Sequence, residues 1–294
     1  IGRGQFSVVW EAIHLSTKNK VAIKCILNNS EHVKTEIAVL KEIYINQQIF
    51  HPFICQYFDF FEVDSMFFIV FEYCVENLVT FSNKRGFLDE KTAHKIFTEL
   101  LYAVESLHND YHIIHRDLKV ENVLIDSNKN VRLSDFGLSV LIKPAYSRSP
   151  RRNTKSILNN QVGSIYYMSP EMVKKEEYDK SIDIWSLGVI LFSITNGRLP
   201  FDGNSYDSVL QKILFTQPQF QSHFSSYSQN LKTLILRMLD KNKKSRITID
   251  EIKKNQWFIE RKYSKFDQFL KNSFLLANFQ IDRLIIEKNF NINI

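Results

Sequence analysis

Short runs of hydrophobic residues alternate with polar turns along the first quarter of the chain. This pattern predicts β-strands joined by tight connections, over residues 6–13, 20–26, 57–61 and 66–73. Between the second and third of these strands, apolar residues recur at helical spacing, which predicts an amphipathic helix over 31–48. The apolar positions of that helix are Ile37, Leu40, Ile43 and Tyr44. We therefore expect a small sheet that carries one helix.

From about residue 89 the spacing of apolar residues becomes helical. We expect long helices over 91–109 and 180–196, and shorter ones over 205–215, 230–239 and 249–254. A strand-rich lobe followed by a helix-rich lobe is an α+β arrangement with two lobes. The stretch 143–161 is rich in Ser, Asn and Arg, and we expect it to be the least regular part of the chain.

Composition narrows the class of protein. Hydrophobic residues make up 44% of the 294 residues and charged residues 24%, as in ordinary globular proteins. No apolar run approaches the roughly 18 residues of a membrane helix, so we expect no membrane span. The net charge of +6 is scattered except within 143–155, so we expect no nucleic-acid partner. Cys25, Cys55 and Cys74 lack metal-ligand spacing and predict free thiols in a reducing, intracellular and cytoplasmic setting.

Two glycines stand close together at the start of the chain, in the run Ile1-Gly2-Arg3-Gly4-Gln5-Phe6-Ser7-Val8-Val9. Glycine lets backbone amides approach phosphates because no Cβ intervenes. A third glycine, usual in such loops, is replaced by Ser7. A strand rather than a helix follows, which disfavours a dinucleotide-binding βαβ unit. Because the chain begins inside this motif, we expect the first strand to be truncated and the true N-terminus to lie upstream.

Lys24 ends the run Val21-Ala22-Ile23-Lys24, one hairpin after the glycines. A lysine at a strand end is usually solvated. Its position after a glycine-rich loop offers another role, in which the ammonium reaches the α- and β-phosphates of a nucleotide and is held by a glutamate on a helix.

The most specific motif is His115-Arg116-Asp117-Leu118-Lys119-Val120-Glu121-Asn122, followed at a distance by Asp135-Phe136-Gly137. An aspartate at position 117 can accept the proton of a substrate hydroxyl and orient its oxygen for in-line attack. Lys119 can neutralise charge on the transferred phosphoryl group. The oxygens of Asn122 and Asp135 suit Mg²⁺.

In this order, the motifs resemble those of a eukaryotic protein kinase domain. The resemblance runs from Gly2 to about Phe258 and includes Glu171, with Arg246 as its expected partner. It implies a two-lobed kinase fold, ATP as co-substrate and Mg²⁺. The domain division that it implies is an N-lobe over 1–72, a hinge over 72–76, a C-lobe over 77–258 and a C-terminal extension of unknown role over 259–294.

The resemblance also implies individual roles. Glu42 is the expected partner of Lys24, with Glu36 as the alternative. Phe71 would stand behind the adenine, and the backbone of Glu72-Tyr73-Cys74 would bond the base. The implied nucleotide-binding residues are Ile1, Gly2, Gly4, Val9, Ala22, Lys24, Phe71, Glu72, Cys74 and Leu124, of which Val9, Ala22 and Leu124 would sandwich the adenine ring.

Lys119, together with Gly163 and Ser164, resembles serine/threonine kinases rather than tyrosine kinases. By this resemblance Ser164 would bridge Asp117 and Lys119. The stretch 178–201 is similar to the calmodulin-dependent and energy-sensing kinase group. The expected partners are protein substrates, with Glu121 favouring a basic residue before the phosphoacceptor; the sequence does not indicate an oligomeric state.

Two other classes remain open. A pseudokinase scaffold usually lacks the lysine, the catalytic aspartate or the metal aspartate, all of which are present here. A small-molecule kinase is disfavoured by the long segment from Asp135 to Glu171, which suits a peptide platform.

Regulation is a separate hypothesis. Arg116 is typical of kinases controlled by an anion on the activation segment. Asn160 occupies the position where relatives carry a phosphorylatable threonine, so we expect phosphorylation at Thr154 and then Ser156 instead, with Ser149 suited to a proline-directed kinase. A segment without a regulatory role is the alternative.

Overall fold

The computed structural model describes residues 2–3, 7–27, 33–64, 66–142 and 164–260, with the backbone alone at 2–3, 33–36 and 164. These residues form two compact units. Unit 1 contains the described residues up to 76 together with 124–137, and unit 2 contains 77–123, 138–142 and 164–260. Ile1, Gly4 and the segment with Ser149, Thr154, Ser156 and Asn160 lie outside the described residues, as does most of the predicted extension.

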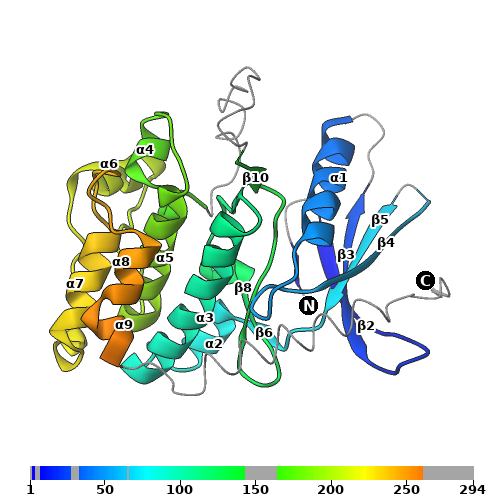
Figure 1. Ribbon diagram of the computed structural model, residues 1–294, viewed down its shortest axis with the longest axis horizontal. Coiled ribbons are helices and arrows are strands. Elements are labelled where there is room, and N and C mark those ends of the chain that lie inside the picture. Colours follow the sequence, from blue (N-terminus) through cyan, green and yellow to red (C-terminus); the bar gives the residue numbers. More distant parts are fainter. Residues whose placement is uncertain (1, 4–6, 28–32, 65, 143–163, 261–294) are drawn as a thin grey trace. The chain divides into compact units, whose positions relative to one another are not determined.

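Unit 1 is built on an antiparallel sheet with the order β1-β2-β3-β5-β4 (Figure 1). Alternation of side chains along each strand gives the sheet two apolar faces. Ile26, Phe67 and Ile69 lie in the cluster shared with the helix, while Val21 and Phe68 lie in the opposite cluster. The strands are β1 (Gly2–Arg3), β2 (Ser7–Ile13), β3 (Lys20–Leu27), β4 (Tyr57–Val63) and β5 (Met66–Glu72).

Helix α1 (Val33–Gln48) packs its Val39 and Ile43 against the sheet. The predicted apolar face is correct for Ile43 and wrong for the rest: Ile37, Leu40 and Tyr44 are 61%, 48% and 56% exposed. The buried stripe instead includes two polar side chains, Glu42 and Asn46. Glu42 pairs with Lys24 of the sheet, and Asn46 Nδ2 donates to the Glu42 carbonyl at 2.8 Å. The ion pair thus requires a helix rotation that the apolar spacing alone does not predict.

A small second sheet has the order β6-β8-β9. Its hairpin turn is held by Asp126, whose Oδ1 accepts from the backbone of Asn128 and Asn130 at 2.9 and 2.8 Å. The strands are β6 (Glu76–Asn77), β8 (Val123–Ile125) and β9 (Val131–Leu133).

Unit 2 is helical around the almost fully buried helix α5 (Ser181–Asn196). A Cβ at Gly188 would lie 2.9 Å from the Met238 Cβ, so only glycine lets α7 approach α5 this closely. Gly197 ends α5 with φ 71°, a left-handed cap. The other elements are α2 (Leu78–Asn83), α3 (Glu90–Asn109), α4 (Pro170–Val173), α6 (Tyr206–Phe215), α7 (Gln229–Met238), α8 (Ile249–Lys254), α9 (Gln256–Glu260), β7 (Ile113–Ile114), β10 (Val140–Leu141) and the 3₁₀ helices η1 (Val120–Asn122), η3 (Ser164–Tyr167) and η4 (Ser222–Ser226).

The predicted α+β class is confirmed, with an antiparallel sheet in one unit and helices in the other. The five helices expected in the second part of the chain are all present within a residue or two of the expected bounds. None of the helices described has the length and apolar composition needed to cross a bilayer.

Candidate active site

In unit 1, Lys24 on β3 is held by two carboxylates. Its Nζ lies 2.6 Å from Glu42 Oε1 and 3.3 Å from Asp135 Oδ1. Burial alone would lower the pKa of Lys24, but Glu42 and Asp135 outweigh it and raise that pKa above its ordinary value. The group is therefore an ammonium at neutral pH. The side chain of the alternative partner, Glu36, lies outside the described residues.

Gly137 lies beside these carboxylates, at a distance where a Cβ would make ordinary van der Waals contact. A Cβ there would lie 3.4 Å from Asp135 Oδ1 and 3.5 Å from Glu42 Oε2. Asp135 itself has φ 67°, a left-handed conformation that is uncommon for a residue other than glycine. Its side chain is 40% exposed, whereas the next residue, Phe136, is 1% exposed. The chain thus turns sharply to bury a ring and leave a carboxylate accessible beside the lysine.

The strand register brings several expected nucleotide-binding residues together on one face of the sheet. Val9 pairs with both Gly2 and Lys24 across the β1-β2-β3 ladder, and Ala22 pairs with Phe71 on β5. Ala22 and Lys24 are two residues apart, so both point to the face that carries Val9 and Phe71. These residues form a continuous surface next to the ammonium.

Three other expected nucleotide-binding residues, Glu72, Cys74 and Leu124, follow the sheet face just described. Glu72 ends β5, and its carboxylate accepts from the Gln56 amide at 2.9 Å and pairs with Arg132 at 3.0 Å. Cys74 is buried. A hydrogen bond with Cys74, and secondly the burial of Cys55 itself, raise the pKa of the Cys55 thiol. Leu124 is half-buried on β8. The three cysteines are free thiols, as expected.

In unit 2, a compact hydrogen-bonded cluster surrounds Asp117. Its Oδ2 accepts from Lys119 Nζ at 2.6 Å and from Asn122 Nδ2 at 3.1 Å. Asn122 also donates to the Asp117 carbonyl at 2.9 Å, which closes the loop on itself. The Asp117 side chain is only 5% exposed, so its carboxylate has a fixed orientation. The side chain of Ser164 lies outside the described residues.

Asp183, in the first turn of α5, anchors this loop. Its carboxylate accepts from the backbone amides of His115 and Arg116 at 2.9 and 3.0 Å, and from His108 Nε2 at 2.7 Å. Burial alone would raise the pKa of Asp183, but these donors hold it below its ordinary value. Sequence reasoning missed this contact. The available signal was a lone acid at the start of an otherwise apolar helix.

Two further features border the loop. The Arg116 guanidinium is mostly buried near the Tyr178 ring, at 5.6 Å, and its Nε has no acceptor among the described residues. Tyr167 in η3 hydrogen-bonds with the Val120 backbone, and burial followed by the charge of Glu121 raises its pKa. The segment after Ser164 is therefore packed against the loop.

The expected pair of Glu171 and Arg246 is present. Nη1 and Nη2 of the arginine bind the two carboxylate oxygens at 2.6 and 2.9 Å, and both side chains are almost fully buried. The pair joins α4 to the segment before α8.

Each unit contributes one oxygen donor of the expected metal set. These are the Asn122 amide in unit 2 and the Asp135 carboxylate, partly open to solvent, in unit 1. Amide and carboxylate oxygens are ligands that Mg²⁺ prefers. No cluster of three or more His, Cys, Asp or Glu side chains suited to a metal occurs among the described residues.

Comparison with known proteins agrees with these motifs. A family model described as the protein kinase domain matches residues 1–258. The chain is 36% identical over 264 residues to an SNF1-related protein kinase catalytic subunit alpha, KIN12, of Arabidopsis thaliana, covering 88% of this chain and 50% of that protein. It is 36% identical over 259 residues to the serine/threonine-protein kinase SIK1 of Rattus norvegicus, covering 87% and 32%. It is 35% identical over 268 residues to a probable serine/threonine-protein kinase, MARK-A, of Dictyostelium discoideum, covering 89% and 24%. The chain thus spans half or less of the length of these relatives.

Proposed function

Because the chain belongs to the protein kinase family, we propose that it transfers the γ-phosphoryl group of Mg-ATP to serine or threonine hydroxyls of protein substrates. The observation that carries this proposal is the buried Asp117 carboxylate, hydrogen-bonded to both Lys119 and Asn122. The predicted likeness to the energy-sensing kinase group agrees with the names of the first relatives. The whole protein's activity and its substrates belong to the proposal, since those relatives are longer.

We assign nucleotide binding to unit 1. Lys24 contacts the α- and β-phosphates and keeps its position through Glu42, and Val9, Ala22 and Leu124 enclose the adenine. Ile1, Gly2 and Gly4 belong to the phosphate loop, and Phe71, Glu72 and Cys74 to the wall and hinge. Support comes from the 2.6 Å ion pair and from the single sheet face shared by Val9, Ala22, Lys24 and Phe71.

We assign phosphoryl transfer to the loop of unit 2. Asp117 accepts the proton of the substrate hydroxyl, whose oxygen forms a bond to the γ-phosphorus as the bond to the leaving ADP breaks. Lys119 offsets the charge of the transferred group, and Ser164 bridges Asp117 and Lys119. Asn122 and Asp135 are the residues that would hold Mg²⁺, which would neutralise charge on the phosphates.

The kinase domain in this proposal spans 1–258, with an N-lobe over 1–72, a hinge over 72–76 and a C-lobe over 77–258. The boundary between the two compact units at residues 76 and 77 supports this division. Residues 259–294 form an extension to which we assign no role.

Regulation by phosphorylation of Thr154, and secondarily of Ser156, is part of the proposal. The half-buried Arg116 supports it, because its buried Nε has no acceptor among the described residues and a guanidinium in that state favours a nearby anion. Glu121 is exposed beside the loop and favours a basic residue before the phosphoacceptor. The free thiols support a reducing compartment.

Replacement of Asp117 by asparagine tests the function. The change keeps the shape but removes the proton acceptor, so kcat should fall by about 10² or more. Transfer of labelled phosphate from Mg-ATP to a generic basic protein measures it, and a thermal-shift titration with Mg-ATP should show unchanged nucleotide binding. Near-wild-type turnover in Asp117→Asn would refute the assignment. Nucleotide binding without any phosphoryl transfer by the wild type would favour a pseudokinase scaffold. Transfer only to small molecules would favour a small-molecule kinase.

A further inference from the structure

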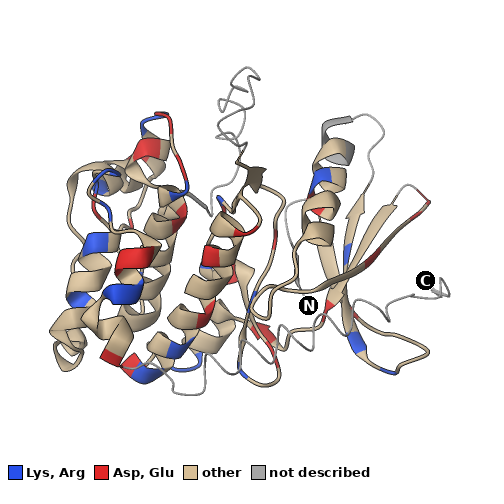
Figure 2. Ribbon diagram, viewed as in Figure 1, with Lys and Arg blue, Asp and Glu red and all other residues tan. Residues whose placement is uncertain are grey.

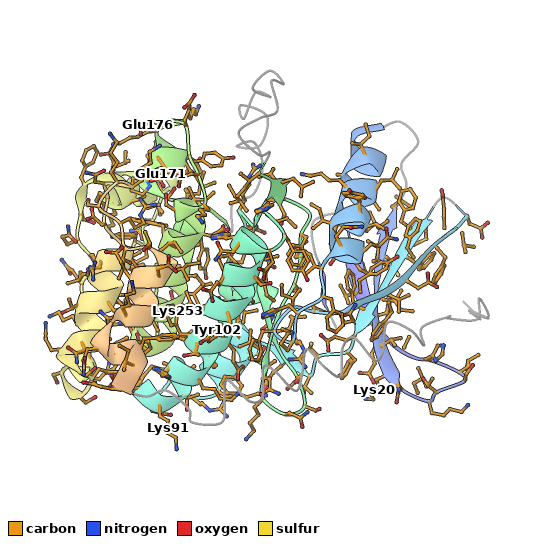
Figure 3. All side chains as sticks on the ribbon, viewed as in Figure 1. Lys20, Lys91, Tyr102, Glu171, Glu176 and Lys253 are labelled. Carbon is orange, nitrogen blue, oxygen red and sulfur yellow. The ribbon has the colours of Figure 1, made fainter. Side chains whose placement is uncertain are left out.

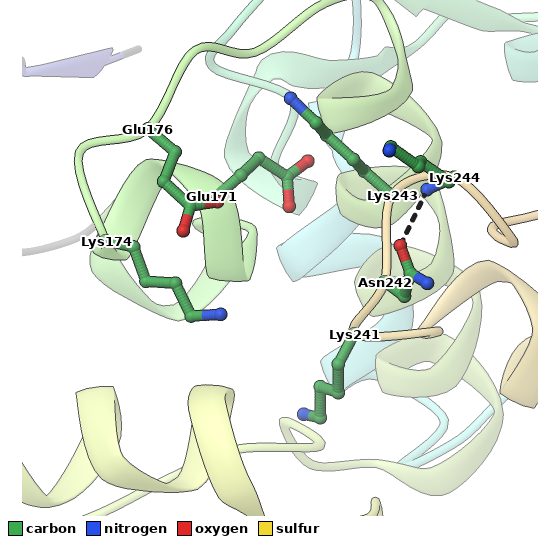
Figure 4. Close-up of a pocket in the computed structure, with 7 residues that line it drawn as sticks. All are labelled: Glu171, Lys174, Glu176, Lys241, Asn242, Lys243 and Lys244. Atoms are coloured by element: carbon green, nitrogen blue, oxygen red, sulfur yellow. Dashed lines mark hydrogen bonds between the residues drawn. The ribbon is translucent and has the colours of Figure 1, made fainter.

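A pocket of about 370 Å³ lies on unit 2, away from the residues assigned to phosphoryl transfer. Figure 4 shows it between α4 with the turn that follows and the segment that joins α7 to α8. Two short stretches far apart in the sequence build it. The lining residues are Glu171, Lys174, Glu176, Lys241, Asn242, Lys243 and Lys244.

One residue of this lysine pocket, Lys243, interacts electrostatically with a carboxylate outside the lining, that of Asp179. Lys174, Lys241, Lys243 and Lys244 form no ion pair with any of the described residues. Where their ammonium groups have partners, these are backbone carbonyls: Lys241 donates to Ile213 O at 2.6 Å, and Lys243 donates to Glu177 O. Carbonyls position an ammonium group without cancelling its charge.

The two acidic residues of the lining reduce this charge only in part. Glu171 already binds Arg246 through both oxygens, so that pair is neutral as a unit. Glu176 is exposed and is the one unpaired acid among the lining residues. Among the lining residues, four lysines therefore accompany one carboxylate without an ion pair, and Asp179 outside the lining offsets part of the charge of Lys243.

Lys241 lines the pocket and packs against two aromatic rings. Its Nζ lies 3.9 Å from the centre of the Phe201 ring and 4.9 Å from that of Trp185. Its bond to a carbonyl at the C-terminal end of α6 gives it a structural role as a helix cap. Burial, and secondarily the charge of Arg246, lower the pKa of Lys241 to about 7. A cation in such surroundings gains from a nearby anion, and no carboxylate among the described residues forms an ion pair with Lys241.

We propose that the lysine pocket binds the phosphate of a phosphorylated serine or threonine in a protein partner. The concave shape and the few ammonium groups suit one compact dianion. Figure 2 shows basic and acidic residues interleaved in unit 2 near α4 rather than a continuous basic surface. Glu176 would repel an extended polyanion such as nucleic acid, and a flat anionic bilayer cannot enter a pocket. Binding does not require phosphoryl transfer, so this inference and the proposed function can fail independently.

Fluorescence anisotropy tests the proposal with a labelled seven-residue peptide of glycine and alanine that carries one central phosphoserine. The peptide has no free hydroxyl to be phosphorylated. We expect the wild-type chain to bind it at least tenfold more tightly than the same peptide with unmodified serine. The double variant Lys174→Glu/Lys244→Glu should lose at least tenfold in affinity, because both residues are exposed and carry two of the charges. Glu176→Gln should bind severalfold more tightly than the wild type.

Lys91→Glu is the matched control, with the same change of charge on an exposed residue of α3. Figure 3 shows Lys91 at the opposite end of unit 2 from Glu171 and Glu176. Its affinity should equal that of the wild type, and the thermal midpoints of all variants should agree within a few degrees. Equal binding of the two peptides, or an equal loss in Lys91→Glu, would overturn the proposal. Full competition by inorganic phosphate at the phosphopeptide's own concentration would also overturn it, since the ligand would then be free phosphate.

Discussion

Replacing Arg246 by methionine should destabilise unit 2 more than almost any other single change of charge in it. The guanidinium and the Glu171 carboxylate are 0% and 3% exposed and share two hydrogen bonds of 2.6 and 2.9 Å. Arg246 also donates to the carbonyls of Ser181 and Asp240, at 3.0 and 3.1 Å. Methionine keeps much of the volume but leaves Glu171 buried beside no cation.

The expected loss of stability follows from the burial of this ion pair. Removing one partner of a buried ion pair costs about 3–5 kcal/mol, because the remaining charge cannot reach water. An exposed pair contributes only about 0–1 kcal/mol. Arg237 and Glu251 form such a pair at 3.1 Å, with side chains 45% and 49% exposed. We therefore expect Arg246→Met to lower the free energy of unfolding by about 3–5 kcal/mol and Arg237→Met by less than about 1 kcal/mol.

Urea unfolding followed by tryptophan fluorescence can measure this difference in unit 2. Trp185 and Trp257 are fully buried there, while Trp10 of unit 1 is 60% exposed and should change little on unfolding. The double variant Arg246→Met/Glu171→Met should recover much of the loss, since it leaves no orphaned charge. Equal shifts for Arg246→Met and Arg237→Met would refute the reasoning. A double variant as unstable as the single one would show that the lost carbonyl contacts, rather than the unpaired carboxylate, cause the effect.

Three other predictions concern activity, regulation and pH. Glu42→Gln should reduce phosphoryl transfer at least tenfold by releasing Lys24, whereas Glu36→Gln should leave it nearly unchanged; the opposite ranking in a kinase assay would reverse the partner assignment. Mass spectrometry after incubation with Mg-ATP should find phosphate on Thr154, and Thr154→Ala should lower activity; an unmodified segment in a fully active enzyme would favour no regulatory role. The pKa of Lys241 is lowered to about 7 in the folded state. Between about pH 7 and about pH 10, Lys241 is therefore protonated in the unfolded state and neutral in the folded state. The free energy of unfolding rises with pH in that window, because the unfolded state binds more protons. Relative to Lys241→Met, the wild type should therefore gain stability between about pH 6.5 and about pH 9 in urea titrations, and parallel pH profiles would contradict the assigned shift.

Much of the candidate site could be predicted from the sequence because its chemistry is local. Asp117, Lys119 and Asn122 lie within six consecutive positions, and a single loop brings their side chains into contact. The helices of unit 2 follow from apolar spacing, and caps such as Asp89, which accepts from the Thr92 amide, mark where they begin. The partners Lys24 and Glu42 could be named only by resemblance, since 17 residues separate them.

The face that α1 buries was decided by the tertiary structure. A helix with apolar residues on several sides can pack in more than one rotation, and Ile37, Leu40 and Tyr44 formed a plausible stripe. The sheet presents an ammonium at Lys24, so the rotation that places Glu42 against it is preferred. That rotation also buries Val39, Ile43 and Ile45, and it gives the buried Glu42 carboxylate a cation, without which its burial would be costly.

Contacts between distant segments also depended on the tertiary structure. In the sequence, Asp183 is a single acid in an apolar helix. Only the fold brings its carboxylate to the backbone amides of His115 and Arg116. The lysine pocket combines residues 171–176 with 241–244, and neither stretch alone differs from a solvated turn. Local spacing determines which groups can share one strand, helix or loop, whereas packing of the core around α5 determines which distant loops meet.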